Sequence, residues 1–166
     1  MSASQSSVLC LFPQEDIPGM EGFRRKHIHH PGRDIPFHVT LMHQFLDPDQ
    51  VNADVLEQLH AIAQATPRFR FQAKSFSYFP TTRVLYLTPT PQGPLEELSA
   101  RLYRAFPTCH DPASGFPIFH MTLALGYPQQ STDAIIAEYF STFGRNPISL
   151  TAHHLGICAQ QGDCWH

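Results

Sequence analysis

The tetrapeptide His-x-Thr-Leu occurs twice in this chain, as residues 38–41 and again as residues 120–123. The two copies lie at matching places in a pattern of strands and helices that repeats after about eighty residues. Chance gives no reason for such matched surroundings, so the sequence predicts a duplicated unit that presents one motif in each half. We place the two units at about residues 7–79 and 81–158.

Hydrophobic periodicity predicts the same order of elements in both units. The first should contain a strand at 7–12, a weak helix near 19–26, the motif strand near 37–45, a helix at 50–65 and a strand at 68–78. The second should contain a strand at 83–87, a helix at 94–106, the motif strand at 119–125, a helix from 132 and a last strand within 148–159. We expect each unit to contribute one sheet with helices on its outer side. The predicted fold is therefore α+β: a single domain over residues 1–166, a bilobal pseudo-symmetric duplication with two antiparallel-rich sheets facing a central cleft.

Composition narrows the choice of partners. A chain of 166 residues is long enough to bury a hydrophobic core. Its net charge of −3 argues against a protein that coats long nucleic acid, but it leaves a nucleotide or a strand end as a ligand. The four cysteines are mostly far apart, and no secretory signal or membrane-length apolar run is present, so we expect reduced thiols and a cytoplasmic location.

The motif residues suit acid/base chemistry. Side chains alternate along a strand, so His38 and Thr40 share one face while the residues between them anchor the strand, and His120 and Thr122 do the same. Two convergent imidazoles can take and give protons near neutral pH, and hydroxyls can donate to the non-bridging oxygens of a phosphate. A lone histidine on a strand is more often a structural polar residue. The repetition at equivalent positions favours the functional interpretation.

With these motifs the chain resembles the 2H phosphoesterase superfamily, and more closely the small bacterial 2′-5′ RNA ligase-like proteins. The resemblance rests on residues 35–41 followed by Phe45, on 84–87, 104–107 and 120–124, and on Trp165. It implies a bilobal fold with a central cleft, no metal, and chemistry at ribose 2′ and 3′ oxygens, typically of 2′,3′-cyclic phosphates or 2′-5′ linkages. By position, it makes His38 and His120 the acid/base pair, and Thr40 and Thr122 the phosphate-binding hydroxyls.

Four further residues are candidates for substrate contact. Many relatives place proline before the motif histidine, where this chain has Phe37 and Phe119, whose rings either stack a base or fill the core. Tyr127 lies four residues beyond the second motif and is open to the same two interpretations. Arg33 ends a basic segment, residues 24–33, that either contacts phosphates or is a solvated loop.

The remaining histidines and cysteines do not form a recognisable metal motif. The chain has no Cys-x-x-Cys or His-Glu-x-x-His, and the adjacent His153 and His154 should point to opposite faces of a strand. We therefore expect no metal and no cofactor, a nucleotide or RNA end as the substrate, no membrane or obligatory protein partner, and a monomer.

The function predicted from the sequence is a metal-independent phosphodiesterase. The alternatives are a nucleotide- or RNA-binding module of the same fold with little or no turnover, and a metal-dependent hydrolase, which chelators would distinguish. The order of acid and base, the direction of the reaction and the physiological substrate stay open.

Overall fold

The computed structural model describes residues 7–109, 115–161 and 164–165. In the first half of the chain the strands and helices are β1 (Ser7–Pro13), α1 (Met20–His27), β2 (Val39–Met42), α2 (Ala53–Gln64) and β3 (Arg70–Phe79). In the second half they are β4 (Val84–Thr90), α3 (Gly93–Ala105), β5 (Met121–Leu125), α4 (Thr132–Phe143), β6 (Ile148–Gln161) and β7 (Cys164–Trp165). The predicted α+β class and order of elements are confirmed, and β7 is an addition.

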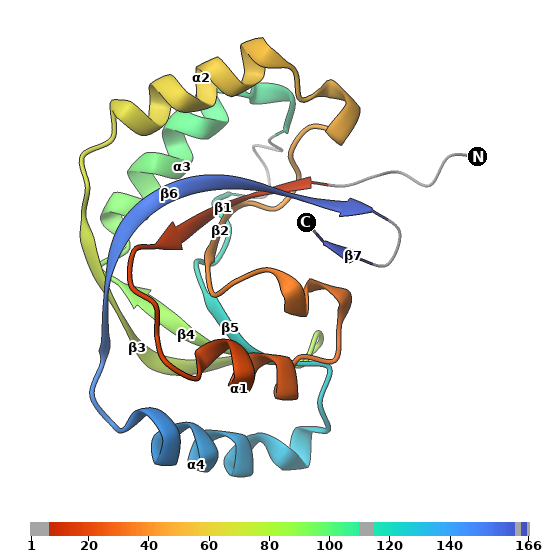
Figure 1. Ribbon diagram of the computed structural model, residues 1–166, viewed down its shortest axis with the longest axis vertical. Coiled ribbons are helices and arrows are strands. Elements are labelled where there is room, and N and C mark those ends of the chain that lie inside the picture. The colour runs from red at the N-terminus through yellow and green to blue at the C-terminus, as the bar shows by residue number, and fades with distance from the viewer. Residues whose placement is uncertain (1–6, 110–114, 162–163, 166) are drawn as a thin grey trace.

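The strands follow the order β2-β1-β6-β3-β4-β5, and every neighbouring pair is antiparallel. The long strand β6 belongs to two sheets, because its first residues pair with β3 and its later residues pair with β1. In Figure 1 it is the long blue strand that arcs along one side of the molecule. The motif strands β2 and β5 therefore end the strand order at its opposite sides.

Each sheet contains strands from both halves of the sequence, which corrects the expectation that each half supplies its own sheet. Strand β3 of the first half pairs with β4 of the second, and β6 of the second pairs with β1 of the first. Hydrophobic alternation shows which face of a strand is buried but not which strand it pairs with, so this exchange is invisible in the sequence. The division at residues 7–79 and 81–158 stays a prediction about the sequence.

The helices are exchanged in the same way. Helices α2 and α3 lie together at one end of the molecule, and α1 and α4 lie at the other (Figure 1). Helix α3, from the second half, packs on β2, whereas α1, from the first half, packs on β5. Each motif strand is therefore supported by a helix from the other half of the chain, and one hydrophobic cluster includes residues of both sheets.

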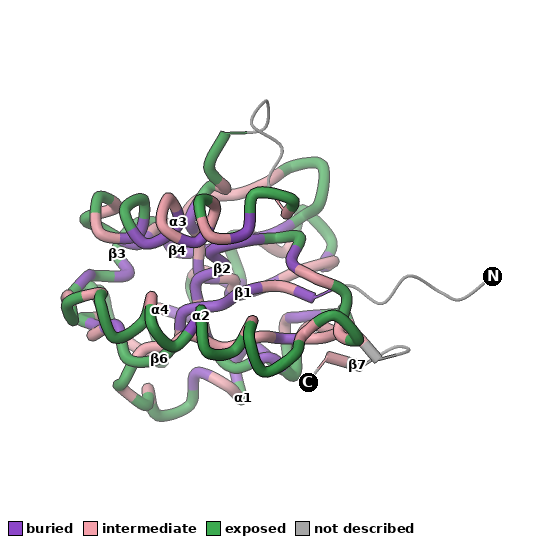
Figure 2. Tube along the Cα trace, turned by 90° about the horizontal axis from the view of Figure 1, so that it is seen from above, coloured by how far each residue is buried: buried purple, intermediate pink, exposed green. Residues whose placement is uncertain are grey.

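Side chains of α3 and the backbone just after α1 also cover the open sides of the two end strands. The Leu41 carbonyl of β2 accepts hydrogen bonds from Ser99 and Tyr103 of α3, at 3.3 and 3.5 Å. The Leu125 carbonyl of β5 accepts one from the His29 amide, at 2.9 Å. Unpaired carbonyls on an end strand would otherwise be buried without a partner or left open to another chain. Figure 2 shows the buried segments gathered along the strands, with exposed turns on the outer helices.

Leu150 tests this arrangement, because it is fully buried on β6 where that strand leaves one sheet for the other. We expect Leu150→Ala to lower the free energy of unfolding by about 2–5 kcal/mol, as large-to-small core substitutions do. Leu56→Ala on α2 is the matched control, since that side chain is 51% exposed. Urea unfolding of both variants should show a large loss for the first only, and equal losses would contradict this placement of β6.

Candidate active site

The two motif histidines are held in the same way. His38 immediately precedes β2, and its Nδ1 lies 2.6 Å from the Pro36 carbonyl oxygen. His120 immediately precedes β5, and its Nδ1 lies 2.7 Å from the Ile118 carbonyl oxygen. Each ring is thus bonded to the backbone two residues before it, at equivalent positions of the duplication.

This bonding fixes the tautomer of both rings. A carbonyl oxygen can only accept, so Nδ1 must be the donor in each ring. The neutral ring then has an unprotonated Nε2 that can accept a proton, and the charged ring has an Nε2–H that can donate one. In both rings Nε2 therefore points away from the backbone carbonyl that holds Nδ1.

The electrostatics indicate that the two rings share one site. Burial is the largest of the effects that lower the pKa of His38 to about 4; the Pro36 hydrogen bond opposes it, and repulsion by Arg24, His120 and His43 adds to it. Burial also lowers the pKa of His120, and the bond to the Ile118 carbonyl opposes this. Both imidazoles consequently favour the neutral form at neutral pH.

Aromatic rings flank each histidine. Phe79 meets the His120 ring edge-on with the centroids 5.2 Å apart, and Tyr86 lies at the same distance on another side. Phe79 comes from β3 and Tyr86 from β4. The Phe12 ring is 5.9 Å from the His38 ring. Such packing restricts the rotamers of the imidazoles, as positioned acid/base groups require.

His43 is a third imidazole at this site, and its position after the motif does not predict it from the sequence. Its ring stacks near His120, with centroids 6.2 Å apart and an interplanar angle of 23°. Burial and the neighbouring His120 lower its pKa. Strand alternation assigns residue 43 to the face opposite His38, but β2 ends at Met42, so the following residue escapes that rule.

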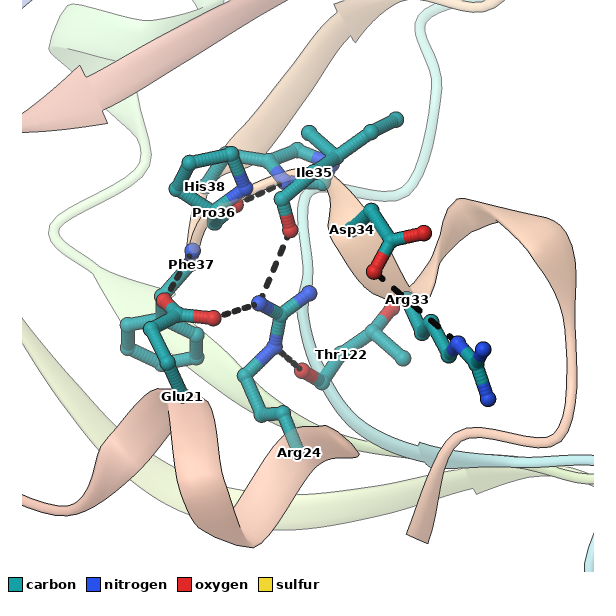
Figure 3. Close-up of polar contacts among 9 residues, drawn as sticks. All are labelled: Glu21, Arg24, Arg33, Asp34, Ile35, Pro36, Phe37, His38 and Thr122. Carbon is teal, nitrogen blue, oxygen red and sulfur yellow. Dashed lines mark hydrogen bonds and ion pairs between the residues drawn. The ribbon is translucent and has the colours of Figure 1, made fainter. Parts of the chain in front are cut away.

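Arg24 of α1 connects the segment before the first motif with the strand of the second motif (Figure 3). Only 1% of this residue is exposed, and its guanidinium donates to the Thr122 carbonyl at 3.0 Å and to the Ile35 carbonyl at 2.9 Å. It also pairs with Glu21 at 2.6 Å, and the other carboxylate oxygen of Glu21 accepts from the Phe37 amide at 2.7 Å. One buried arginine therefore ties the segment before His38 to the strand after His120.

The two motif threonines differ in exposure. Thr40 is 8% exposed, and its hydroxyl is within hydrogen-bonding reach of Cys10, its neighbour across β1 and β2. Thr122 is half-buried and lies opposite Tyr86. Thr40 therefore has less free surface to offer a ligand than Thr122 has.

Three of the predicted substrate contacts are corrected by burial. Phe37, Phe119 and Tyr127 are 5%, 2% and 2% exposed and belong to the hydrophobic core. The Tyr127 hydroxyl lies 3.3 Å from that of Thr132, at the start of α4. The alternative interpretation, in which these rings fill the core, agrees with the structure, because rings so covered offer no face to a ligand.

The basic segment is divided among several structural roles. Its first residues belong to helix α1, where Arg24 is buried and Lys26 and His27 contact Glu138 of α4 at 2.8 and 3.1 Å. Arg33 lies in the short turn Pro31–Asp34 with an exposed side chain, 3.9 Å from the Asp34 carboxylate. Arg33 is exposed, as is Arg25 of the same segment, and contact of Arg33 with a phosphate stays a prediction.

Within the described residues, no three His, Cys, Asp or Glu side chains converge as a group that could hold a metal ion. The side chains of Cys164 and His166, which are also of the types that bind metals, lie outside the described part. The helices described here are all too short or too polar to cross a membrane.

Comparison with known proteins identifies the family. The family model of the 2′-5′ RNA ligase superfamily matches residues 12–163. A Geobacillus sp. (strain WCH70) protein named "Putative phosphoesterase GWCH70_0799" is 28% identical over 138 residues, which cover 82% of this chain and 75% of that protein. A Geobacillus kaustophilus protein of similar name is 28% identical over 96 residues, 57% of this chain and 56% of its own length.

Solved structures share the fold at low sequence identity. E. coli LigT in its apo form has a TM-score of 0.57 and 18% identity, covering 99% of this chain and 94% of LigT. The LigT complex with 3′-AMP has a TM-score of 0.56 and 20% identity, covering 95% and 88%. The match to the family model spans most of the chain and shows that it is one of the 2H phosphoesterases. The chain belongs to the 2′-5′ RNA ligase superfamily of these proteins.

The Arg24 bridge can be tested by its effect on stability. Arg24→Met removes the donor to two backbone carbonyls and leaves Glu21 without its partner, so we expect a loss of about 3–5 kcal/mol in the free energy of unfolding. Arg25→Met is the matched control, because Arg25 is the exposed neighbour on the same helix. Denaturant unfolding of both variants gives the comparison, and an Arg24→Met variant as stable as the control would refute the bridge.

Proposed function

We propose that this protein is a metal-independent phosphodiesterase that acts on 2′,3′-cyclic phosphates or 2′-5′ phosphodiester bonds of nucleotides or RNA ends. The observation that carries the proposal is the matched pair of imidazoles, each fixed through Nδ1 to a backbone carbonyl and each left with Nε2 as its working nitrogen. Membership of the phosphoesterase superfamily supports the reaction class.

In this proposal His38 is the general base and His120 the general acid in hydrolysis of a cyclic phosphate. Arg24 repels a proton on His38 but is not among the groups that lower the pKa of His120, so His38 is the more readily neutral ring. His38 Nε2 takes a proton from the attacking water as the new phosphorus–oxygen bond forms. His120 Nε2 gives its proton to the ribose oxygen that leaves phosphorus, and the product is a ribose phosphate monoester.

Hydroxyl and imidazole donors would stabilise the charge on phosphate. Thr122 and Thr40 each follow a motif histidine by two residues, and in this proposal their hydroxyls donate to the non-bridging oxygens as negative charge grows there. His43 adds a third imidazole near His120 that can donate to the same group when protonated. Arg33 is an exposed cation available to a second phosphate of a longer substrate.

The proposed substrate and location rest on two further observations. Structures of E. coli LigT, which shares the fold, hold 3′-AMP, ATP and NADP+, and this favours a nucleotide-containing ligand here. Cys10, Cys109 and Cys158 are free thiols, which suits a reducing, cytoplasmic location.

Substitution of either histidine tests the mechanism. We expect His38→Ala and His120→Ala each to lower kcat about 10²- to 10⁴-fold, because each removes one proton-transfer group. The assay is product formation from 2′,3′-cyclic nucleotides, cyclic-phosphate-ended oligonucleotides and 2′-5′ dinucleotides in excess chelator. His60→Ala, an exposed histidine on α2, is the control. Turnover that survives both motif substitutions would refute the assignment, and nucleotide binding without turnover would favour the binding-module alternative.

The pH dependence of kcat/KM gives a separate test. The base must be deprotonated, so activity should appear as pH rises through the His38 pKa of about 4. The acid must be protonated, so activity should fall as pH rises through the His120 pKa, which lies below the usual 6.5. We therefore expect a bell-shaped profile for the free enzyme that peaks on the acidic side of pH 6.5. A maximum in the alkaline range would contradict these roles.

A further inference from the structure

A pocket that reaches the two residues before His38 is not used by the proposed chemistry. It lies between the end of β1, the start of α1 and the segment that leads into β2, and its volume is about 290 Å³. Pro36 is part of its lining, and the Pro36 carbonyl is the oxygen that holds His38 Nδ1. The pocket therefore begins at the backbone that positions the proposed base.

One wall of this pocket is a pair of stacked rings. Phe12 of β1 and His154 of β6 lie opposite each other in the strand register, with centroids 4.9 Å apart and an interplanar angle of 16°. Phe12 is half-buried and His154 is exposed. Since the Phe12 ring is also 5.9 Å from the His38 ring, the aromatic pair lies next to the ring of the proposed base.

Gly156 makes room for this arrangement. It lies on β6 opposite Cys10, two residues beyond His154, and a Cβ there would be 2.7 Å from Cε2 of Phe12. Carbon atoms cannot approach so closely, so any other residue would displace the ring. The glycine thus allows Phe12 to lie against β6, next to His154.

The charge of the pocket identifies which part of a nucleotide it can accept. The described residues that line it include the carboxylates of Glu15, Asp16 and Glu21, the last of which is paired with Arg24, and no lysine or arginine is among them. Burial opposes ionisation of Glu15, but hydrogen bonds from the amide and hydroxyl of Thr151, at 2.6 and 2.7 Å, outweigh it and hold its pKa below the ordinary value. An acidic pocket repels phosphate, whereas carboxylate oxygens accept hydrogen bonds from amino groups.

We propose that this pocket binds the nucleobase of the substrate, stacked on Phe12 and His154, with preference for bases that carry an exocyclic amino group. The proposal rests on the proposed function and extends it: the ribose would lie between the aromatic pair and His38, with the phosphate at the histidines. Adenine, guanine and cytosine have the amino group and uracil lacks it, so cytosine and uracil form the closest test pair.

The test compares two adjacent histidines on β6. By isothermal titration calorimetry on the full chain, we expect His154→Ala to raise the Kd for 3′-CMP roughly 5- to 100-fold, in the range of one lost stacking contact. His153→Ala is the control, because His153 does not line this pocket, and its Kd should equal that of the wild type. The wild type should bind 3′-CMP more tightly than 3′-UMP. An unchanged Kd in His154→Ala, or equal affinity for the two nucleotides, would overturn the subsite or its base preference respectively.

A second variant and a kinetic measurement separate this proposal from the one on which it rests. Gly156→Ala should displace the Phe12 ring and weaken 3′-CMP binding, although it changes no group that a base would touch. With 2′,3′-cyclic CMP, both variants should raise KM and leave kcat nearly unchanged. Absence of turnover in the wild type would refute the phosphodiesterase, while loss of 3′-CMP binding in His154→Ala would still support the subsite. Turnover with an unaltered KM in both variants would refute the subsite alone.

Discussion

The contact on which the site most depends is the buried guanidinium of Arg24. The two motif strands end the strand order at opposite sides, so no ladder of hydrogen bonds holds them together. Arg24 joins them by donating to the carbonyl of Thr122 on β5 and to that of Ile35 before β2. Its planar fork makes this possible, since it offers several donors in fixed directions, which a lysine ammonium does not. Glu21 balances the buried charge and at the same time holds the Phe37 amide.

The exchange of elements between the two halves of the chain makes this contact possible. Helix α1 carries Arg24 from the first half and packs on the motif strand of the second. Helix α3 packs on the motif strand of the first half, where Ser99 and Tyr103 donate to the Leu41 carbonyl. Neither half could complete its own motif strand, because the groups that pair with its open side come from the other half. The positions of the two histidines therefore depend on both halves of the chain.

The sequence predicted the features that depend on a local pattern, but it did not predict those that depend on long-range packing. The order of elements and the two motifs follow from periodicity and repetition, so they were recoverable. The role of Arg24 was not, because an arginine in a run of basic residues has no local signal for burial, and only the fold places carbonyls around it. His43 was missed because alternation does not extend past the end of a strand. The burial of Phe37, Phe119 and Tyr127 depends on which helices cover them, which the pattern left open.

The burial of the histidines also affects their protonation, and so the point at which the proposed reaction can begin. His38, His43 and His120 each have a lowered pKa, and burial is the first cause in all three. The free site thus holds little positive charge of its own, although Arg24 lies close by. A phosphate bound between the rings would favour their protonated forms, since an opposite charge at short range raises the pKa of an imidazole. The nearby guanidinium opposes this at His38, so the proton would settle on His120. In the proposed reaction, the arginine that joins the two strands therefore also decides which ring becomes the acid, and the substrate itself completes the acid/base pair.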